Sequence, residues 1–474
     1  MRGIRGECFR GRRSVAAALV AMLAASVSAG ASAADLTPEQ KLFRATYQEL
    51  IEINTSDSEG DTTEAAKAMQ KRLLDAGFKV EDTEVIAPFP RKGNLVARYK
   101  GSGAKKPMLL LAHIDVVEAK RSDWKTDPFK LQEKDGVFTA RGSIDDKAMA
   151  SIYVSVLSQL KREGFTPSRD IVLALTADEE KGSSPANGAA WLLKNRRAMV
   201  DADFGINEGG RGELKDGKPL SHIVQIAEKT YVHVEFEATG PGGHSARPTV
   251  DNTIYELAEA LGRLRQYQFP VRLNDAARVY FERSAALQSG QMAADMREVA
   301  KPTPDPAAIA RLSKVASIVG LLRTTCVATM LNAGHAPNAL AQNAKATVNC
   351  RMLPDENLKT VTDKLTEIAG PKIKVVVMPE SDPAPASPLR ADVMGPIESV
   401  SAEMWPGVPV IPTMGVSTTD SRHYREAGIP MYGVSGLFAD PADTGVHGLN
   451  EHIGVQQLYD GREYLYRLIK KLAQ

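Results

Sequence analysis

Acidic residues and histidines gather in five short stretches of this chain, next to apolar runs. Such side chains can bind a metal ion or exchange protons during a reaction. In an open α/β sheet, ligands bind beyond the carboxyl ends of the strands, so these stretches can converge on one site. Each stretch alone is typical of a solvated loop, and only their joint occurrence indicates a site. They are His113-Ile114-Asp115, Arg141 to Lys147, Asp178-Glu179-Glu180, Asn207 to Gly210 and Val446-His447-Gly448.

Apolar runs and helical periodicities alternate along the part of the chain that carries most of these stretches. Residues 108–112 and 171–176 are continuous apolar runs, as expected for strands buried on both faces. Residues 62–77, 148–160 and 189–194 place apolar side chains at helical spacing. Strands that alternate with helices predict an α/β layer with a mostly parallel sheet.

The middle of the chain has a different pattern, with the order β-α-β-β-α-β. This order predicts a compact ferredoxin-like unit. A mainly helical insertion is expected within it at residues 268–322, with an exposed loop at 302–306. The six predicted elements are residues 231–238, 252–267, 324–331, 344–352, 358–368 and 373–378.

Length and composition agree with one domain inserted into another. A chain of 474 residues exceeds the size at which a single core stops growing. The contents of 43% hydrophobic and 25% charged residues are typical of a globular protein, and nothing in them indicates a disordered chain, a collagen or an integral membrane protein. We expect residues 34–225 and 381–474 to form one domain and residues 226–380 the inserted one.

The first 33 residues predict a secretory signal peptide. Five arginines precede an apolar run at residues 15–27, and Ala31-Ser32-Ala33 is a typical cleavage site. The run is short for a membrane span, so an uncleaved anchor is the weaker alternative. We expect a secreted or periplasmic protein, with the Sec and twin-arginine routes both open.

Cleavage after Ala33 would change the balance of charge. It removes five arginines and Glu7, so the formal net charge goes from +1 to −3. That near-neutral balance gives no electrostatic footprint for nucleic acid or an anionic membrane surface.

Two cysteines remain after Cys8 leaves with the signal peptide. Cys326 and Cys350 lie at similar distances on either side of a predicted turn near Asn338. They could therefore face each other across two antiparallel strands and form a disulfide in an oxidising compartment. Two buried, inert thiols are the alternative.

Taken together, the five stretches resemble the M20 family of zinc peptidases. The resemblance implies an α/β zinc-hydrolase catalytic domain with an inserted ferredoxin-like lid or dimerisation domain. It extends over most of the chain and is strongest to the carboxypeptidase S-like branch, within a group that includes glutamate carboxypeptidases. The segments that carry this closer similarity are His113, Trp124, Pro128-Phe129, Arg141-Gly142 and Asp145-Asp146-Lys147.

The resemblance implies a centre of two Zn²⁺ ions. One ion would be held by His113, Asp145 and Glu208, and the other by Asp145, Glu180 and His447. Asp145 would bridge the pair, which suits two ions about 3.5–4 Å apart. Co²⁺ and Mn²⁺ are candidate replacements for zinc.

Two further acids are implied to serve this centre. Asp115 would accept the second ring N–H of His113 and fix its tautomer. Glu179 would be the general base that takes a proton from the attacking water and passes it to the leaving amine. The peptide bond between Asp145 and Asp146 is expected to be cis, as it often is in the family.

The inserted domain is implied to supply a catalytic histidine. His244, within the glycine-rich residues 240–248, would stabilise the oxyanion. In many relatives this histidine comes from the partner subunit, which would require a homodimer. In others it comes from the same chain, and the insertion at 268–322 could serve that purpose. Both arrangements stay open.

Four residues are implied to bind the substrate. Asn338 and Arg351 match positions that grip the substrate's carboxylate, which the planar guanidinium can pair in a bidentate manner. Gly415 and Ser417 belong to a segment, residues 415–420, that resembles the family's substrate loop.

These residues predict hydrolysis of an amide next to a free carboxylate. A secreted carboxypeptidase or dipeptidase acting on short peptides is the leading hypothesis. An aminoacylase-like enzyme that cleaves N-acyl amino acids is the alternative. A binding protein on an inactive hydrolase scaffold is a remote third, because no ligand and no base is missing from the sequence.

Overall fold

The structure is a computed structural model that describes residues 36–182, 184–378 and 383–474. Residues Pro38–Gln474 form one compact unit. The predicted signal peptide, residues 1–33, and the predicted domain boundary at residues 380 and 381 lie outside the described residues. Within the described part of the chain, no helix combines the length and the apolar character that crossing a membrane requires.

A ten-stranded sheet positions three of the five stretches, since residues 113–115, 178–180 and 207–210 lie at the ends of its strands or just after them. Its central strands β6, β3, β7 and β17 are parallel neighbours, whereas β1, β2 and β8 run antiparallel to strands beside them. The predicted mostly parallel α/β layer is therefore confirmed, with antiparallel additions. In spatial order the strands are β1 (Thr83–Phe89), β2 (Lys92–Tyr99), β6 (Ile171–Thr176), β3 (Met108–His113), β7 (Phe204–Asn207), β17 (Met431–Gly433), β9 (Lys218–Glu228), β8 (Gly212–Lys215) and β18 (Phe438–Ala439), with β16 (Val410–Gly415) paired to β9.

Helices cover the central strands, which are buried along their whole length. Leu109 and Leu111 of β3 pack in one cluster with Leu192 of α4, and α3 also contacts β3. Burial of both faces explains why these strands are continuously apolar. The helices of this layer are α1 (Pro38–Glu52), α2 (Thr62–Asp75), α3 (Lys147–Arg162), α4 (Gly188–Asn195), α5 (Arg197–Val200), α12 (Ala391–Met404), α13 (Ser421–Glu426) and α14 (Val455–Leu472).

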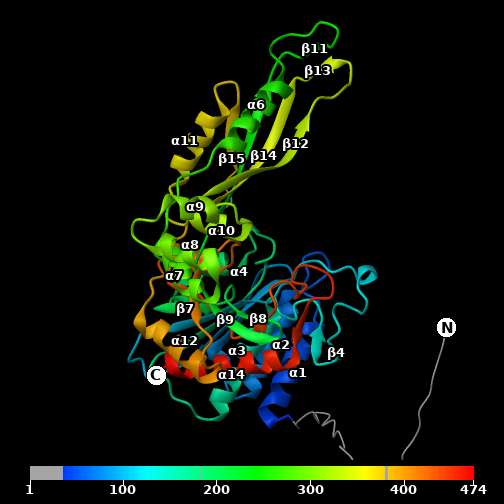
Figure 1. The fold of residues 1–474 in the computed structure, drawn as a ribbon. Helices are drawn as coiled ribbons and strands as arrows, with labels where there is room; N and C mark the ends of the chain where they lie inside the picture. The colour runs from blue at the N-terminus through cyan, green and yellow to red at the C-terminus, as the bar shows by residue number, and fades with distance from the viewer. Residues whose placement is uncertain (1–35, 183, 379–382) are drawn as a thin grey trace, which may run out of the picture. The chain divides into compact units, whose positions relative to one another are not determined.

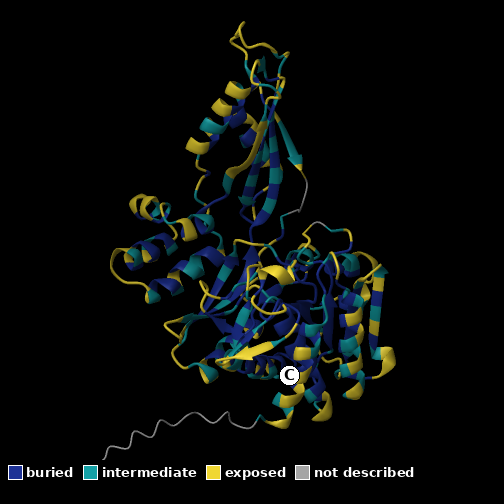
Figure 2. Ribbon diagram, turned by 90° about the vertical axis from the view of Figure 1, so that its right-hand side faces the viewer, coloured by how far each residue is buried: buried dark blue, intermediate teal, exposed yellow. Residues whose placement is uncertain are grey.

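A separate four-stranded antiparallel sheet forms the predicted ferredoxin-like unit. Its two central strands, β14 and β10, alternate between buried and partly exposed residues, because helices cover one face of the sheet (Figure 2). The order β10, α6, β12, β14, α11, β15 confirms the predicted β-α-β-β-α-β succession. The elements are β12 (Thr325–Ala333), β14 (Asn343–Met352), β10 (Thr230–Thr239) and β15 (Lys374–Met378), in spatial order, with α6 (Thr253–Gln266) and α11 (Leu358–Ala369).

Two very short strands extend one end of this sheet. β11 (Gly243–His244) pairs with β13 (Ala339–Leu340), where the sequence predicted only a glycine-rich loop and a turn. The pairing places His244 opposite Ala339, beyond the end at which Thr239 pairs with Asn343. Figure 1 shows both strands at that end of the sheet.

The insertion at residues 268–322 is helical, as predicted, and it packs on the ten-stranded sheet. α7 contacts β16, and Arg283 Nη1 donates a hydrogen bond to the carbonyl of Val410 at 2.7 Å. The buried Lys229 Nζ, between β9 and β10, donates to the carbonyl of Arg323 at 2.7 Å, where the insertion ends. Its helices are α7 (Asp275–Ser284), the 3₁₀ turn η3 (Ala285–Leu287), α8 (Gly290–Ala300), α9 (Pro306–Leu312) and α10 (Ala316–Leu322).

A disulfide joins Cys326 and Cys350, with an S–S distance of 2.00 Å. The two residues are directly opposite each other in the antiparallel pair β12 and β14. The structure therefore decides between the two alternatives in favour of the bridge, which lies next to Arg351.

A small three-stranded sheet completes the fold near the ligand stretches. β19 pairs with β5, and this pairing brings the C-terminal region beside residues 137–139. The strands are β4 (Gln132–Lys134), β5 (Val137–Thr139) and β19 (His452–Gly454), and the remaining 3₁₀ turns are η1 (Val80–Asp82) and η2 (Arg121–Asp123).

Candidate metal centre and active site

The five predicted metal ligands come from five different places in the catalytic layer. His113 ends β3, Glu180 lies in the loop after β6, and Glu208 directly follows β7. Asp145 lies just before α3, and His447 lies in the loop that leads to β19. These side chains converge because the carboxyl ends of parallel strands meet at one edge of the sheet.

The ligand atoms form two groups that share Asp145. In the first group, His113 Nε2 lies 3.1 Å from Asp145 Oδ1 and 3.8 Å from Glu208 Oε1. In the second, His447 Nε2 lies 3.1 Å from Asp145 Oδ2 and 3.0 Å from Glu180 Oε2. Each oxygen of Asp145 thus faces a different histidine, which is the geometry of a bridging carboxylate.

The chemistry of this donor set fits metal ions. Among the described residues, neither Lys nor Arg forms an ion pair with Asp145, Glu180 or Glu208. Burial raises the pKa of Glu208 well above its usual value, and the neighbouring Asp145 charge adds to the shift. Buried carboxylates that lack a cationic side chain are stabilised by a bound cation. Imidazole and carboxylate oxygens are ligands that zinc accepts.

Asp115 connects the histidine to the loop that carries Glu179 and Glu180. Its two carboxylate oxygens accept the backbone N–H groups of Glu179 at 3.2 Å and Glu180 at 3.0 Å. His113 Nδ1 lies 3.1 Å from the backbone carbonyl of Asp115 and 3.6 Å from its carboxylate. The backbone carbonyl is therefore the nearer acceptor for the ring N–H, and the carboxylate mainly holds the loop.

Glu179 lies beside the ligand groups as predicted. Burial raises the pKa of its carboxyl well above the usual value; His113 opposes this shift, whereas the negative charges of Asp420 and Glu180 add to it. The peptide bond between Asp145 and Asp146 is cis, as expected.

Glu451 holds the loop that carries Asp145, although no sequence motif singles this residue out. Its carboxylate accepts the N–H groups of Gly142 at 3.0 Å, Ile144 at 2.9 Å and Asp145 at 3.1 Å. The buried Arg141 pairs with it at 2.7 Å. The one available signal was its place four residues after His447.

A second buried carboxylate, Glu228, holds the predicted substrate loop. Thr419 donates to it from its N–H at 3.1 Å and from its hydroxyl at 2.6 Å, and Arg425 pairs with it at 2.8 Å. At the start of this loop, the backbone of Gly415 lies close to the Gln225 side chain. A Cβ at this position would fall 2.2 Å from that side chain, so no larger residue fits without a shift. Neither Glu228 nor Arg425 belongs to a motif that the sequence could reveal.

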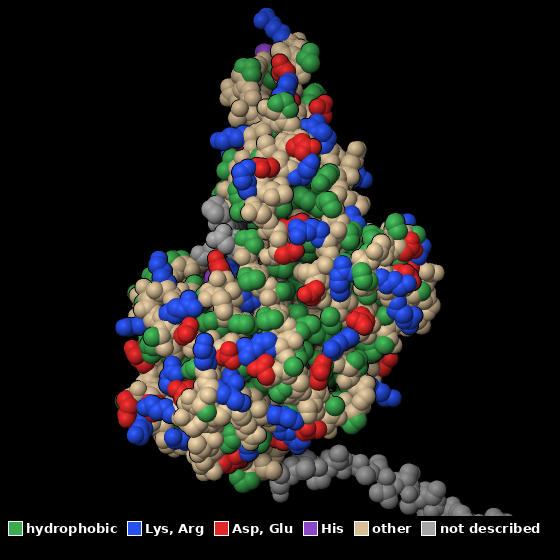
Figure 3. Space-filling model, turned by 90° about the vertical axis from the view of Figure 1, so that its left-hand side faces the viewer, with side chains coloured by type: hydrophobic (Ala, Val, Ile, Leu, Met, Phe, Trp, Pro, Cys, Tyr) green, Lys and Arg blue, Asp and Glu red, His purple; other side chains and the backbone are tan. Residues whose placement is uncertain are grey.

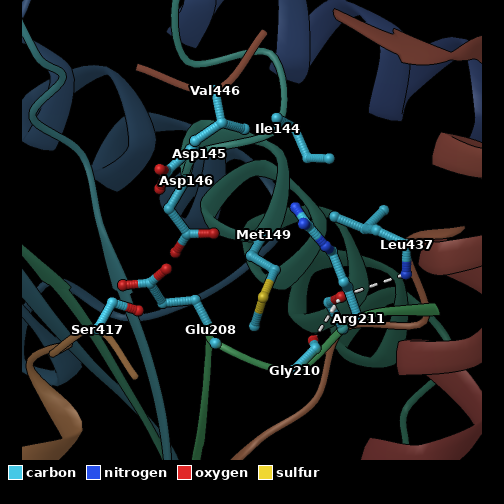
Figure 4. A pocket seen from close by; sticks show the side chains of 12 residues that line it. Ile144, Asp145, Asp146, Met149, Glu208, Gly210, Arg211, Ser417, Leu437 and Val446 are labelled. Carbon is cyan, nitrogen blue, oxygen red and sulfur yellow. Dashed lines mark hydrogen bonds between the residues drawn. The ribbon is translucent and has the colours of Figure 1, made fainter. Parts of the chain in front are cut away.

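Two pockets open from the metal ligands. One, of about 250 Å³, is lined by Asp145, Glu208, Ser417 and the side chain of Arg211 (Figure 4). The other, of about 670 Å³, is lined by Glu180, Tyr231, Arg351 and Thr418. The predicted residues Ser417 and Arg351 thus both lie beside the ligand groups, in different pockets.

His244 and Asn338 lie together, but far from Arg351. Ser245 N donates to the carbonyl of Asn338 at 3.1 Å, and both predicted residues are exposed. Arg351 pairs with Tyr231 at the opposite end of β14. Eight residues separate the pair Tyr231–Arg351 from Thr239–Asn343, which corresponds to roughly 27 Å of strand. Asn338 and Arg351 of one chain therefore do not meet at one carboxylate.

Comparison with known proteins agrees with this architecture. Residues 109–471 match the peptidase family M20/M25/M40. The chain belongs to this family. As an M20 protein it is a metallohydrolase, and the two ligand groups occupy the described catalytic layer.

The relatives place this M20 chain in the branch of carboxypeptidase S and PM20D1. The N-fatty-acyl-amino acid synthase/hydrolase PM20D1 of Mus musculus is 28% identical over 379 residues, covering 77% of this chain and 74% of that protein. The probable carboxypeptidase S-like 2 of Dictyostelium discoideum is 27% identical and covers 92% of this chain and 85% of its own. Carboxypeptidase S of Saccharomyces cerevisiae is 26% identical, with coverages of 77% and 71%.

Solved structures share the fold. The M20 family metallo-carboxypeptidase Sso-CP2 from Sulfolobus solfataricus has a TM-score of 0.68 at 18% identity, covering 92% of this chain and all of that one. The dipeptidase Dug1p from Saccharomyces cerevisiae has a TM-score of 0.61 at 16% identity, with coverages of 92% and 98%.

Proposed function

We propose that this M20 chain is a two-zinc hydrolase that cleaves the amide bond next to a free carboxylate, as an exported carboxypeptidase or dipeptidase acting on short peptides. The observation that carries the proposal is the pocket shared by Glu180 and Arg351. A substrate carboxylate paired with Arg351 would place the neighbouring amide beside the ligand groups. The guanidinium carbon of Arg351 lies 4.2 Å from the centre of the Tyr231 ring, a cation–π contact that holds the side chain at this pocket.

The site residues divide the chemical work. His113, Asp145 and Glu208 would hold one ion, and Asp145, Glu180 and His447 would hold the other. When bound, the ions polarise the scissile carbonyl and lower the pKa of water. Glu179 accepts the proton of the attacking water and delivers it to the leaving amine. Asp115 fixes Glu179 relative to His113, through the loop amides that it binds.

His244 and Asn338 act on a neighbouring molecule in this proposal. Both residues lie at the end of the four-stranded sheet that is remote from Arg351, and both are exposed. The insertion at 268–322 packs against β16 and does not bring His244 toward its own ligand groups. We call the end of the four-stranded sheet that carries His244 and Asn338 the tip. In a homodimer, the tip of each chain would lie at the metal centre of the other chain and complete both active sites.

Hydrolysis of N-acyl amino acids is the second candidate. It is favoured by the PM20D1 relatives, whose names describe N-fatty-acyl-amino acid synthase/hydrolases. Both reactions cleave an amide beside a free carboxylate, so they need the same residues. They differ in the group on the amino side of the bond.

Matched substrates test the proposal. Zinc-loaded protein should hydrolyse dipeptides, lose activity with EDTA, and regain it with Zn²⁺. Carboxyl-amidated dipeptides should be poor substrates. Arg351→Gln should lower kcat/KM roughly ten- to a hundredfold on free-acid dipeptides, and much less on amidated ones. Activity that survives complete metal removal, or an equal loss on both substrate types, would contradict the proposal.

Export is part of the proposal. The signal-like residues 1–33 and the disulfide between Cys326 and Cys350 support it, since disulfides persist in oxidising compartments. Fractionation of cells that produce the full chain should find a shortened, disulfide-bonded protein outside the cytoplasm. An uncleaved cytoplasmic protein with two free thiols would contradict export.

A further inference from the structure

Arg211 places an unpaired positive charge in the smaller pocket. Among the described residues, its guanidinium has no hydrogen bond, ion pair or aromatic partner, although its backbone carbonyl accepts from Ile223 N at 2.9 Å. The side chain is only partly exposed. Figure 4 shows it extending across the pocket toward Ile144. An arginine that is partly desolvated and has no partner can pair with an incoming anion.

Apolar side chains line one part of this pocket, and acidic side chains of the metal centre line another part. Met149 and Leu437 lie beside the Arg211 side chain, whereas Asp145 and Glu208 mark the side that holds the ligands (Figure 4). A substituent that enters from the reacting amide would therefore pass apolar side chains before it meets the guanidinium. This combination fits a short methylene stem that ends in an acid group.

Arg211 also discriminates between classes of substituent. A long apolar acyl chain in this pocket would take the guanidinium out of water without giving it a partner, which is costly. A carboxylate at the end of a short stem would instead form a charge-assisted, bidentate pair. The pocket thus favours an acidic group over a purely apolar one.

We propose that this pocket selects an acidic side chain or acyl group on the amino side of the scissile bond, with Arg211 as the specificity residue. The assignment of the side rests on the proposed function, in which the Arg351 pocket takes the carboxylate beside the bond. The substrate class is then an amide with two anionic ends, such as a dipeptide with glutamate at its amino end.

The test compares dipeptides that differ in the charge of the side chain at the amino end. For zinc-loaded wild type, kcat/KM should be roughly ten- to a hundredfold higher for Glu-Leu than for Gln-Leu. Arg211→Gln should bring this ratio close to one. Arg211→Glu should favour Lys-Leu over Glu-Leu. Lys215→Gln is the matched control, since it removes an exposed positive charge from the nearby β8, and it should keep the wild-type ratio.

Two results would overturn the inference: a wild-type ratio near one, or an unchanged ratio in Arg211→Gln. Circular dichroism and zinc content check that each variant is folded and loaded. If no dipeptide is hydrolysed, the proposed function is wrong. The role of Arg211 in the pocket can then still be tested by ligand binding. Calorimetry should show that glutarate binds zinc-loaded wild type more tightly than glutaramate, and that Arg211→Gln removes this difference. Equal affinities in wild type would refute the role of Arg211.

Discussion

Adjacent residues have different tasks in this site. Glu180 lies 3.0 Å from His447 Nε2, within one ligand group, whereas Glu179 belongs to neither group. Both backbone amides are bound by the single carboxylate of Asp115. One acid thus holds the turn in which consecutive side chains point to different partners.

Substitution should separate these two tasks. Glu179→Gln should lower kcat by about 10²–10⁴-fold while zinc stays bound, because the side chain keeps its shape but can no longer accept a proton. Glu180→Gln, the matched variant one residue away, should reduce zinc content as well as activity. Metal analysis beside steady-state kinetics checks both. A Glu179→Gln protein with near-normal kcat would remove Glu179 as the base.

The ligand residues could be predicted from the sequence because the five stretches that carry them occur in an order that resembles the M20 family, and His113, Glu180 and Glu208 also lie at or after the ends of apolar strands. Glu451, Glu228 and Arg211 could not. Each is a single residue outside any motif, and its role depends on where distant segments meet. Glu451 acts on a loop more than 300 residues earlier in the chain. Such contacts are set by tertiary packing, which local sequence patterns do not record.

At the scale of elements, periodicity predicted both layers well. The six elements of the ferredoxin-like unit were predicted in the correct order. Burial alternates with period 2 in β10 and β14, and it follows one face in the helices α6 and α11. Pairings between distant strands were not predictable. β16 lies parallel to β9 although about 180 residues separate them, and β11 and β13 are two-residue strands that have no periodicity to detect.

β9 also carries a histidine that should make stability depend on pH. His222 is fully buried against Trp405, Phe438 and Tyr464, and its Nδ1 lies 2.9 Å from the hydroxyl of Ser401. That hydroxyl donates to the Ile397 carbonyl, so it accepts its second hydrogen bond from Nδ1–H of His222. Burial lowers the pKa of His222 to about 3.

The direction of the effect follows from the two states. The unfolded chain binds a proton at a pKa of about 6.5, and the folded chain only near 3. Between these values, lowering the pH favours unfolding. With chelator present, the free energy of unfolding should be measured for wild type and for His222→Gln as the pH is lowered. Its decrease per pH unit should be larger in wild type than in the variant by about 1 kcal/mol. Urea titrations from pH 7 to 4 measure this difference, and parallel curves would contradict it.

At the scale of the whole molecule, two residues that the sequence assigns to the active site, Arg351 and His244, lie at opposite ends of one sheet. Arg351 shares a pocket with Glu180, whereas His244 lies beyond the far end of β14. Described charges on the surface do not form a one-sided pattern on the face drawn in Figure 3, where basic and acidic side chains are interspersed. Association through the tip would therefore depend on local shape and polar contacts.

Mixing two inactive variants tests whether His244 acts in the partner. Glu179→Gln inactivates the site of its own chain, and His244→Ala inactivates the site that its tip serves. Hybrid dimers would retain one intact site, so an equal mixture should recover about a quarter of wild-type activity. Each variant alone should stay inactive. A mixture without recovery, despite subunit exchange shown by size and labelling, would place His244 in its own chain's site.

Because β14 separates His244 from Arg351, the activity of the proposed dimer should depend on enzyme concentration. A catalyst whose oxyanion donor arrives on another molecule has a specific activity that depends on its own concentration. Dilution after export would separate the copies, and turnover per chain would fall steeply below the dissociation constant of the pair. The exported enzyme would then be dimeric and active near the cell, where its concentration is high, and monomeric and inactive farther away.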